Sequence, residues 1–197
     1  MKKLCFLLLI SAICSFSYAQ SNGGSNGNGS KMPPLDKSPL DMSYFPADYP
    51  VLRIQEKASE PLVCRVIYSR PQKNNRTVFG ELVEYHKIWR LGANEATEIE
   101  FFKDVQVDGK KLPKGKYTLY ALPTPEEWTI IFNKETDIWG AFKYDEKKDV
   151  LRVKLPVKKV AEPIEAFSIG FDKSNGDKAK LNIGWDTDMV SLPITTK

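Results

Sequence analysis

One nine-residue segment, Trp89–Thr97, concentrates the side chains of this chain that could do chemistry. Its polar and turn-forming members are an arginine, a glycine, an amide and a carboxylate: Arg90, Gly92, Asn94 and Glu95. Such groups are costly to bury unless they bond to one another or to a ligand. We therefore predict a ligand site at this segment, in which Arg90 and Glu95 are polar anchors and Asn94 shapes the bend.

The sequence leaves two interpretations of Arg90 and Glu95 open. The two residues flank the turn at Gly92-Ala93, so the guanidinium could bind the carboxylate internally and fix the loop. The same fork of N–H groups could instead bind an anionic ligand through two parallel hydrogen bonds. Trp89 or Trp139 would then supply an apolar wall for a flat ligand such as a sugar ring. The candidate ligand-binding residues are Trp89, Arg90, Asn94, Glu95, Arg70, Arg76 and Trp139.

No residue set typical of a known catalytic or metal site is present in the sequence. His86 is the only histidine, which excludes zinc and copper sites that need two or three imidazoles. No Gly-x-Ser-x-Gly motif supports a serine nucleophile. We therefore predict no catalytic residue, no metal and no cofactor, and a binding protein rather than an enzyme. The alternative from another class is an envelope hydrolase that uses Glu95 with a partner such as Tyr68 or Ser69.

The first nineteen residues have the pattern of a secretory signal peptide. Lys2 and Lys3 precede an apolar run, and Ser17-Tyr18-Ala19 places small residues where signal peptidase cuts, so we expect cleavage before Gln20. The apolar run is too short to be a permanent membrane anchor. The residues before Cys14 do not match the lipoprotein pattern. We predict an exported protein, located in the periplasm or outside the cell, and not a lipoprotein.

The charge distribution bears on the partners of the mature chain. Loss of Lys2 and Lys3 lowers the net charge from +4 to +2, and the remaining charges are interspersed rather than clustered. We therefore expect neither nucleic acid nor an anionic membrane surface as a partner. No apolar stretch after the signal reaches the length of a membrane span. Cys64 is the single cysteine left after cleavage, and its apolar surroundings indicate a small core residue rather than a reactive thiol.

After the signal peptide, the chain divides into a flexible arm and one β domain. Residues 20–50 are rich first in Ser, Asn and Gly and then in Pro, which favours an extended tether. In residues 51–197 apolar and polar residues alternate, as in Leu151–Val157, and alternation is typical of strands with one buried face. We predict an all-β fold, a single antiparallel β-sandwich of about 8–10 strands with one short helix. The helix is indicated by a stripe at Phe79, Leu82, Val83 and His86.

Five short motifs carry a family resemblance. They are Tyr68-Ser69-Arg70-Pro71, Arg76-Thr77-Val78-Phe79-Gly80, Trp89–Thr97, Leu112–Leu119 and the pair Trp139-Gly140. Together they resemble an uncharacterised family of exported bacterial proteins, domain of unknown function 2911, over nearly all of the chain after Val51. The resemblance implies export, a β-rich domain and no assigned activity. Where the family usually has Pro and Gly around Tyr85, this chain has Glu84 and His86, so we do not expect His86 to be shared catalytic machinery.

These observations lead to one functional hypothesis and two alternatives. The leading hypothesis is an exported, non-catalytic module that binds a small ligand or carbohydrate at Trp89–Thr97. The first alternative is the hydrolase described above. The second is an interaction protein that docks a partner through exposed strand edges and the Pro-rich arm.

Overall fold

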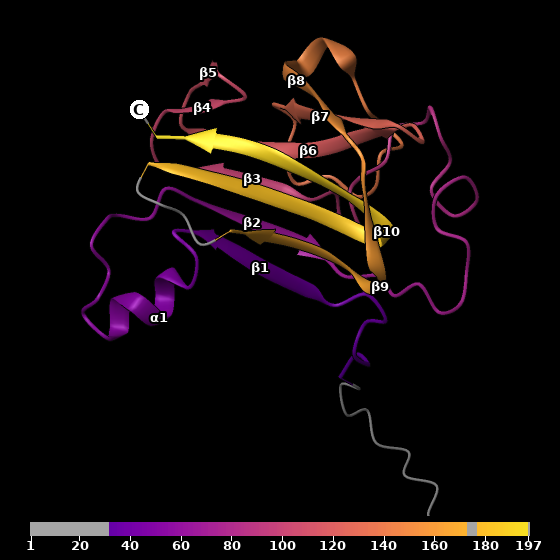
Figure 1. The fold of residues 1–197 in the computed structure, drawn as a ribbon, viewed down its shortest axis with the longest axis horizontal. Coiled ribbons are helices and arrows are strands. Elements are labelled where there is room, and N and C mark those ends of the chain that lie inside the picture. Colours follow the sequence, from indigo (N-terminus) through magenta and orange to yellow (C-terminus); the bar gives the residue numbers. More distant parts are fainter. Residues whose placement is uncertain (1–31, 173–176, 197) are drawn as a thin grey trace, which may run out of the picture. The chain divides into compact units, whose positions relative to one another are not determined.

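The computed structural model describes residues 32–172 and 177–196, in which ten strands, one α-helix and one 3-10 helix are found (Figure 1). The expected signal peptide, residues 1–19, and the arm as far as residue 31 lie outside the described residues. Leu35–Lys197 forms one compact unit. Of the preceding unit, Met1–Pro34, only residues 32–34 are described, and these have no regular secondary structure. No helix in the described part has both the length and the hydropathy needed to cross a membrane.

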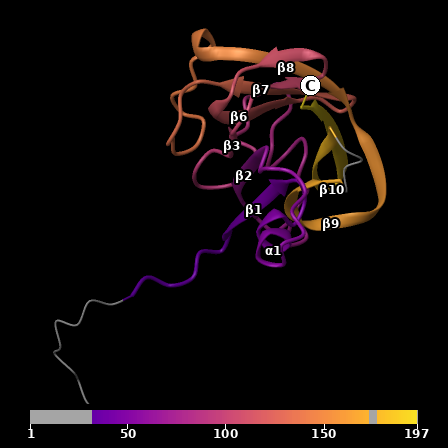
Figure 2. The same ribbon diagram turned by 90° about the vertical axis from the view of Figure 1, so that its left-hand side faces the viewer.

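The strands form two antiparallel sheets that face each other, which confirms the predicted all-β sandwich (Figure 2). The larger sheet has the order β1 (Leu40–Phe45), β2 (Cys64–Ser69), β3 (Glu98–Phe101), β6 (Gly115–Pro123), β7 (Glu127–Asn133), β8 (Asp149–Pro156). The smaller sheet has the order β5 (Lys110–Leu112), β4 (Val105–Val107), β10 (Lys178–Thr195), β9 (Lys158–Phe171). Strands that are neighbours in sequence are often neighbours in a sheet, as in the β6–β7–β8 meander.

The core lies between the two sheets and is rich in aromatic rings. Trp89 is at its centre, with ring centroids 5.9 Å from Phe79, 5.7 Å from Trp128, 5.2 Å from Phe167 and 6.1 Å from Trp185. Each of these aromatic contacts adds to the burial of a large apolar area. The predicted alternation places Trp128 and Trp185 here, and both are fully buried.

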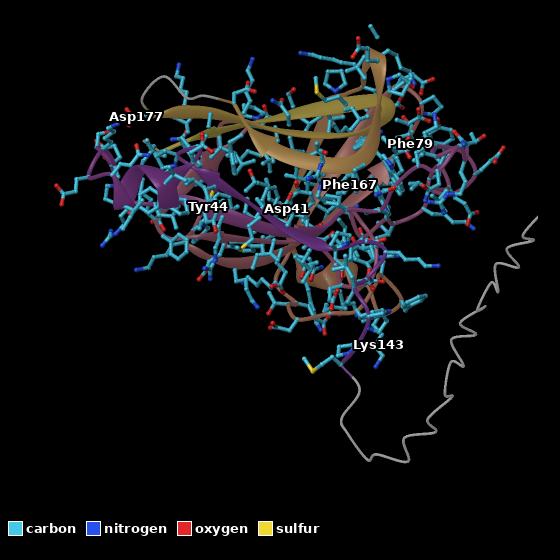
Figure 3. All side chains as sticks on the ribbon, turned by 90° about the horizontal axis from the view of Figure 1, so that it is seen from below. Asp41, Tyr44, Phe79, Lys143, Phe167 and Asp177 are labelled. Atoms are coloured by element: carbon cyan, nitrogen blue, oxygen red, sulfur yellow. The ribbon has the colours of Figure 1, made fainter. Side chains whose placement is uncertain are left out.

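A second, smaller apolar cluster lies on the outer face of the larger sheet, by which we mean the face directed away from the smaller sheet. Its buried members are Ala96, Tyr120 and Ile131, and Ile88, Ala141 and Tyr144 pack against them. The segment Lys134–Lys148, which includes the 3-10 helix η1 (Glu146–Lys148), covers this part of the face. In Figure 3, Lys143 of this segment lies on the side opposite to β9 and β10.

The structure places the start of the compact unit earlier than the predicted boundary at residue 51. β1 falls within the predicted arm, yet it pairs with β2 from Leu40↔Ser69 to Phe45↔Cys64. Phe45 is 1% exposed and stacks on Phe171, with 5.7 Å between ring centroids. The prolines of the arm flank β1 and do not interrupt it, so the ladder of backbone hydrogen bonds is preserved.

The single α-helix of the described residues is not where the stripe at Phe79–His86 predicted it. It is α1 (Tyr49–Ile54), which lies in the predicted arm and buries none of its residues. At the stripe the chain forms turns, in which the Gly80 N–H donates to the Val83 carbonyl oxygen at 2.9 Å. These turns bring Phe79 and Val83 together in an isolated bridge, so the apolar spacing reflects a folded-back loop rather than a helix face.

Candidate functional site

The predicted bend is a tight turn that β2 holds in place. Three of its residues have left-handed backbone angles, with φ of 54° at Leu91, 138° at Gly92 and 56° at Asn94. The Ser69 hydroxyl accepts a hydrogen bond from the Ala93 N–H at 2.9 Å and donates one to the Ala93 carbonyl oxygen. A Cβ at Gly92 would lie 2.9 Å from the Ser69 carbonyl oxygen, so only glycine fits this approach. Both backbone groups of Ala93 are therefore hydrogen-bonded to β2, which holds the bend against the sheet.

After the bend, the chain pairs with a second loop. The Ala96 N–H donates to the Ile138 carbonyl oxygen at 2.9 Å, and the Gly140 N–H donates to the Asn94 carbonyl oxygen at 2.9 Å. These two bonds enclose an antiparallel bridge between Glu95 and Trp139. Residues that face each other between such bonds have neighbouring side chains on one side of the ladder. We call this pair, with its flanking segments Asn94–Ala96 and Ile138–Gly140, the Glu95–Trp139 platform.

The platform presents its two central side chains to solvent. Trp139 is 60% exposed, whereas the other three tryptophans are 7% exposed or less. Glu95 is also exposed, and it makes no hydrogen bond or ion pair within the described part of the chain. The indole ring of Trp139 and the carboxylate of Glu95 are therefore both available to a ligand.

A pocket of about 150 Å³ adjoins the platform on the outer face. Its apolar lining comes from Leu40, Ile67, Tyr68, Ala96 and Ile138, and its carboxylates are Glu95, Glu98 and Asp137. Lys116 pairs with Glu98 at 3.1 Å and with Asp137 at 2.6 Å, and the Asp137 N–H donates to Glu98 at 2.6 Å. The hydrogen bond from Lys116 lowers the pKa of Asp137, so this carboxylate remains an acceptor at neutral pH. Glu95 is the carboxylate of the pocket that is left without a cation.

Trp89 does not face this pocket. Its ring is 7% exposed within the aromatic core, and its indole N–H donates to the Gly92 carbonyl oxygen at 3.2 Å. Trp89 thus holds the bend from the inside. Of the two tryptophans predicted as an apolar wall, Trp139 is the one that a ligand could contact at the surface.

Arg90 and Glu95 form no ion pair in the structure, so the internal lock left open by the sequence is absent. Arg90 is partly buried, and burial lowers the pKa of its guanidinium. Its Nε is shut off from solvent without a hydrogen-bond partner. The backbone of Arg90 is used, since its carbonyl oxygen accepts from the Thr97 N–H at 3.1 Å.

The other candidate residues have contacts of their own. The Asn94 side-chain amide donates to Asp36 at 3.0 Å, which ties the bend to the segment before β1. Arg70 binds the Phe167 carbonyl oxygen at 3.2 Å, Ser168 at 3.0 Å and Asp41 at 3.0 Å, and so joins β1 to β9. Asp41 and Phe167 are labelled in Figure 3.

Arg76 also bonds within its own surroundings. It donates to the carbonyl oxygens of Lys73, at 2.9 Å, and Gln72, at 2.5 Å, within its own exposed loop. Neither Arg70 nor Arg76 bonds to the platform or lines its pocket, among the described residues.

Two residues considered for a hydrolase are engaged in the structure. Ser69 is 1% exposed, and its hydroxyl is committed to both backbone groups of Ala93. Tyr68 packs its ring against Phe167, and burial raises the pKa of its hydroxyl. Within the described part, no cluster of three or more His, Cys, Asp or Glu residues could hold a metal ion.

Sequence reasoning missed Asp137 and Ile138 of the pocket, and it missed Lys116, which pairs with two of the pocket's carboxylates. The available signal was the Asp137-Ile138-Trp139-Gly140 run, where the alternation breaks and an aromatic residue precedes glycine. Asp137 and Gly140 have positive φ of 62° and 72°, so this run forms the second turn of the platform. Its pairing with Asn94–Ala96 is long-range and has no local marker in the sequence.

Comparison with known proteins gives one match. Residues 53–194 match the model of a family described as "Protein of unknown function (DUF2911)". Searches of curated proteins and of solved structures gave no match.

Proposed function

The chain belongs to this family of unknown function, and we propose that it is an exported, non-catalytic protein that binds a small polar ligand, a sugar ring or similar polyol, at the Glu95–Trp139 platform. The observation that carries the proposal is the pairing of an exposed tryptophan with an unpaired carboxylate beside a pocket of about 150 Å³. The pocket has space for part of such a ligand, with the remainder on the exposed Trp139 ring.

The chemistry of the two side chains suits a sugar. A sugar ring has an apolar C–H face, which stacks on an indole, and a rim of hydroxyl groups, which donate to carboxylates. Glu95, the bridge partner of Trp139, supplies a free acceptor, and Glu98 and Asp137 supply acceptors that Lys116 already orients. Ile67 and Ile138 add apolar surface to the lining, against which the C–H groups of a sugar could pack.

The rigidity of the platform supports binding. A preformed site loses little conformational entropy when the ligand arrives, and this raises affinity. The two turns of the platform are tied to each other by backbone hydrogen bonds and to β2 through Ser69. These bonds hold the backbone of Glu95 and that of Trp139 next to each other, with or without a ligand.

The absence of catalysis is part of the proposal. A glycosidase needs a carboxyl group that keeps its proton near neutral pH, next to a second, ionised one. Lys116 lowers the pKa of Asp137, which is the opposite of what a general acid requires. The Ser69 hydroxyl is used by the bend, so it does not supply a nucleophile to the pocket.

Export enters the proposal from the sequence of residues 1–19, with its basic start, apolar run and small residues before Gln20. A periplasmic or released location would place the platform among envelope and extracellular carbohydrates. Fractionation of expressing cells, with N-terminal sequencing of the product, tests this part: a chain that begins at Gln20 outside the cytoplasm is expected, and an uncleaved cytoplasmic chain would contradict it.

Calorimetric titration with a panel of envelope sugars and acidic metabolites tests the binding itself. We expect saturable heat with at least one sugar, and loss of this heat in Glu95→Gln without a change in the free energy of unfolding. Glu126→Gln, at an exposed position outside the pocket, is the matched control and should bind as the wild type does. No heat across the panel, or equal binding by Glu95→Gln, would refute the proposed site.

A further inference from the structure

The pocket beside the Glu95–Trp139 platform carries charge of mainly one sign. Its lining includes the three carboxylates of Glu95, Glu98 and Asp137 and no lysine or arginine. Among the described residues, Lys116 alone forms ion pairs with these carboxylates, at 3.1 Å from Glu98 and 2.6 Å from Asp137. Three carboxylates and one ammonium group leave an excess of two negative charges at the pocket.

Lys116 is an example of an ammonium group held by carboxylates of this pocket. Its Nζ donates a hydrogen bond to Asp137 at 2.6 Å and also pairs with Glu98. The hydrogen bond to Asp137, and after it the one to Glu98, raise the pKa of Lys116 although burial acts in the other direction. These carboxylates therefore stabilise the protonated form of an amine.

Glu95 has no such partner, and its neighbour across the bridge is an aromatic ring. Glu95 and Trp139 are flanked by hydrogen bonds between the adjacent residues and are not bonded to each other through the backbone. In antiparallel pairs of this kind the Cα atoms are about 4.5 Å apart and the side chains are close together on one side of the ladder. Both side chains are exposed, so one ligand can contact the carboxylate and the indole together.

A protonated amine is a group that interacts favourably with both side chains. It donates charge-assisted hydrogen bonds to a carboxylate, and the electron-rich face of an indole attracts it. A neutral hydroxyl group lacks the charge for these two effects, and a carboxylate on the ligand would be repelled by Glu95. We propose that the platform selects ligands that carry a protonated amine, which means amino sugars among the sugars and polyols of the proposed function, on which this inference rests.

The other charges around the platform do not favour an anion or a metal ion. Asp36 accepts from the side-chain amide of Asn94, the residue before Glu95, and makes no ion pair within the described part. Arg90, the cation of the bend, does not line the pocket. A metal ion needs several ligands that converge on one point, and no such cluster is found among the described residues.

Calorimetric titration of the purified protein with matched sets of sugars tests the preference. For glucose, galactose and mannose, the neutral sugar is compared with its amino, N-acetylamino and uronate forms at about pH 6, where an amine is protonated and a uronate is ionised. We expect the amino form to bind about tenfold more tightly than the neutral form, and the N-acetylamino form to lose this gain. The uronate should bind most weakly, and added salt should weaken the binding of the amino form.

Reversal of one charge should remove the preference. Glu95 is exposed and makes no hydrogen bond or ion pair within the described part, so Glu95→Lys should fold as the wild type does. This variant should lose the preference for the amino form and bind the uronate more tightly than the wild type does. Glu126→Lys makes the same change of charge at an exposed position outside the pocket, and it should keep the wild-type order of affinities.

The outcomes separate this inference from the proposed function. If a neutral or uronate form binds the wild type as tightly as the amino form does, the preference for an amine is refuted, whereas the platform remains a sugar site. An unchanged preference in Glu95→Lys, or an equal loss in Glu126→Lys, would also overturn the inference. If no sugar of the sets binds, the proposed function fails together with it.

Discussion

The Ser69 hydroxyl holds Ala93 by both of its backbone groups, accepting from the N–H at 2.9 Å and donating to the carbonyl oxygen. One side chain on β2 thereby provides Ala93 with the two hydrogen bonds that a neighbouring strand would otherwise make. The bend that follows carries Asn94 and Glu95 to their positions on the platform. The candidate site thus depends on a contact between segments that are distant in sequence.

Replacement of this serine should loosen the bend. Ser69→Ala leaves both backbone groups of the partly buried Ala93 without their partner, and we expect the free energy of unfolding to fall by about 1–3 kcal/mol. Urea denaturation measures the change. Ser43→Ala on β1, whose hydroxyl makes no hydrogen bond in the described part, should stay within about 0.5 kcal/mol of the wild type. A Ser69→Ala protein as stable as Ser43→Ala would contradict this role.

Gly92 should tolerate no side chain. Its φ of 138° is unfavourable for other residues, and a Cβ would meet the Ser69 carbonyl oxygen at 2.9 Å. We expect Gly92→Ala to lower the free energy of unfolding by about 2–4 kcal/mol, through backbone strain and steric clash together. Gly109→Ala separates the two causes, because Gly109 has a φ of 74° with open space around it, and it should cost only about 1 kcal/mol. If urea denaturation gives the same loss of unfolding free energy for Gly92→Ala and Gly109→Ala, the close approach of Gly92 to Ser69 does not contribute to stability.

Arg70 should affect stability and not ligand binding. Its guanidinium joins Asp41 to the Phe167 backbone and to Ser168, but it is 38% exposed, so solvent weakens the ion pair. We expect Arg70→Met to lower the free energy of unfolding by about 1–2 kcal/mol and to keep the affinity for any ligand of the platform. Arg76→Met, in an exposed loop, should change stability by less than about 0.5 kcal/mol. Weaker ligand binding by a folded Arg70→Met would contradict this prediction and show that Arg70 contributes to binding.

Alkaline pH should destabilise the fold through Tyr144. Burial and the hydrogen bond that its hydroxyl donates to Asp149 raise the pKa of Tyr144 to about 12. In the unfolded chain a tyrosine titrates near about 10, so between about pH 10 and 12 the unfolded state binds fewer protons than the folded state. The contribution is fully present below about pH 10, and the free energy of unfolding falls as the pH rises through this window.

Urea denaturation at a series of pH values measures this slope. Tyr144→Phe should show a shallower decline than the wild type, since the phenylalanine has no proton to lose. Tyr85→Phe, whose hydroxyl makes no hydrogen bond in the described part, should keep the wild-type decline. An unchanged slope in Tyr144→Phe would exclude Tyr144 as its cause.

The sandwich could be predicted from the sequence because alternation and turns are local. In Leu151–Val157 the buried positions are Val153 and Leu155, as the period of two requires. The position of the helix was not predictable, because the Phe79–His86 spacing fits both a helix and a turn that returns on itself. β1 was not predicted, because the segment around it is rich in proline and this composition is typical of a flexible tether.

The geometry of the candidate site could be predicted in part. The bend at Gly92 follows from turn-forming residues, and the break in alternation at Trp139 marked a residue open to a surface role. What joins them is the pairing of Glu95 with Trp139, which depends on tertiary folding alone. The burial of Trp89 likewise depends on four rings contributed by other segments.

Quenching of tryptophan fluorescence by acrylamide tests the central claim most directly, because Trp139 is the one tryptophan of the four that is exposed. A sugar that stacks on Trp139 should shield it, so quenching of the wild type should fall in a saturable way as the sugar is added. Trp139→Phe should lack this change while remaining folded, and Phe142→Ala, an exposed aromatic outside the bridge, should retain it. A sugar panel that leaves the quenching of Trp139 unchanged, or a ligand that binds Trp139→Ala as tightly as the wild type, would contradict the account.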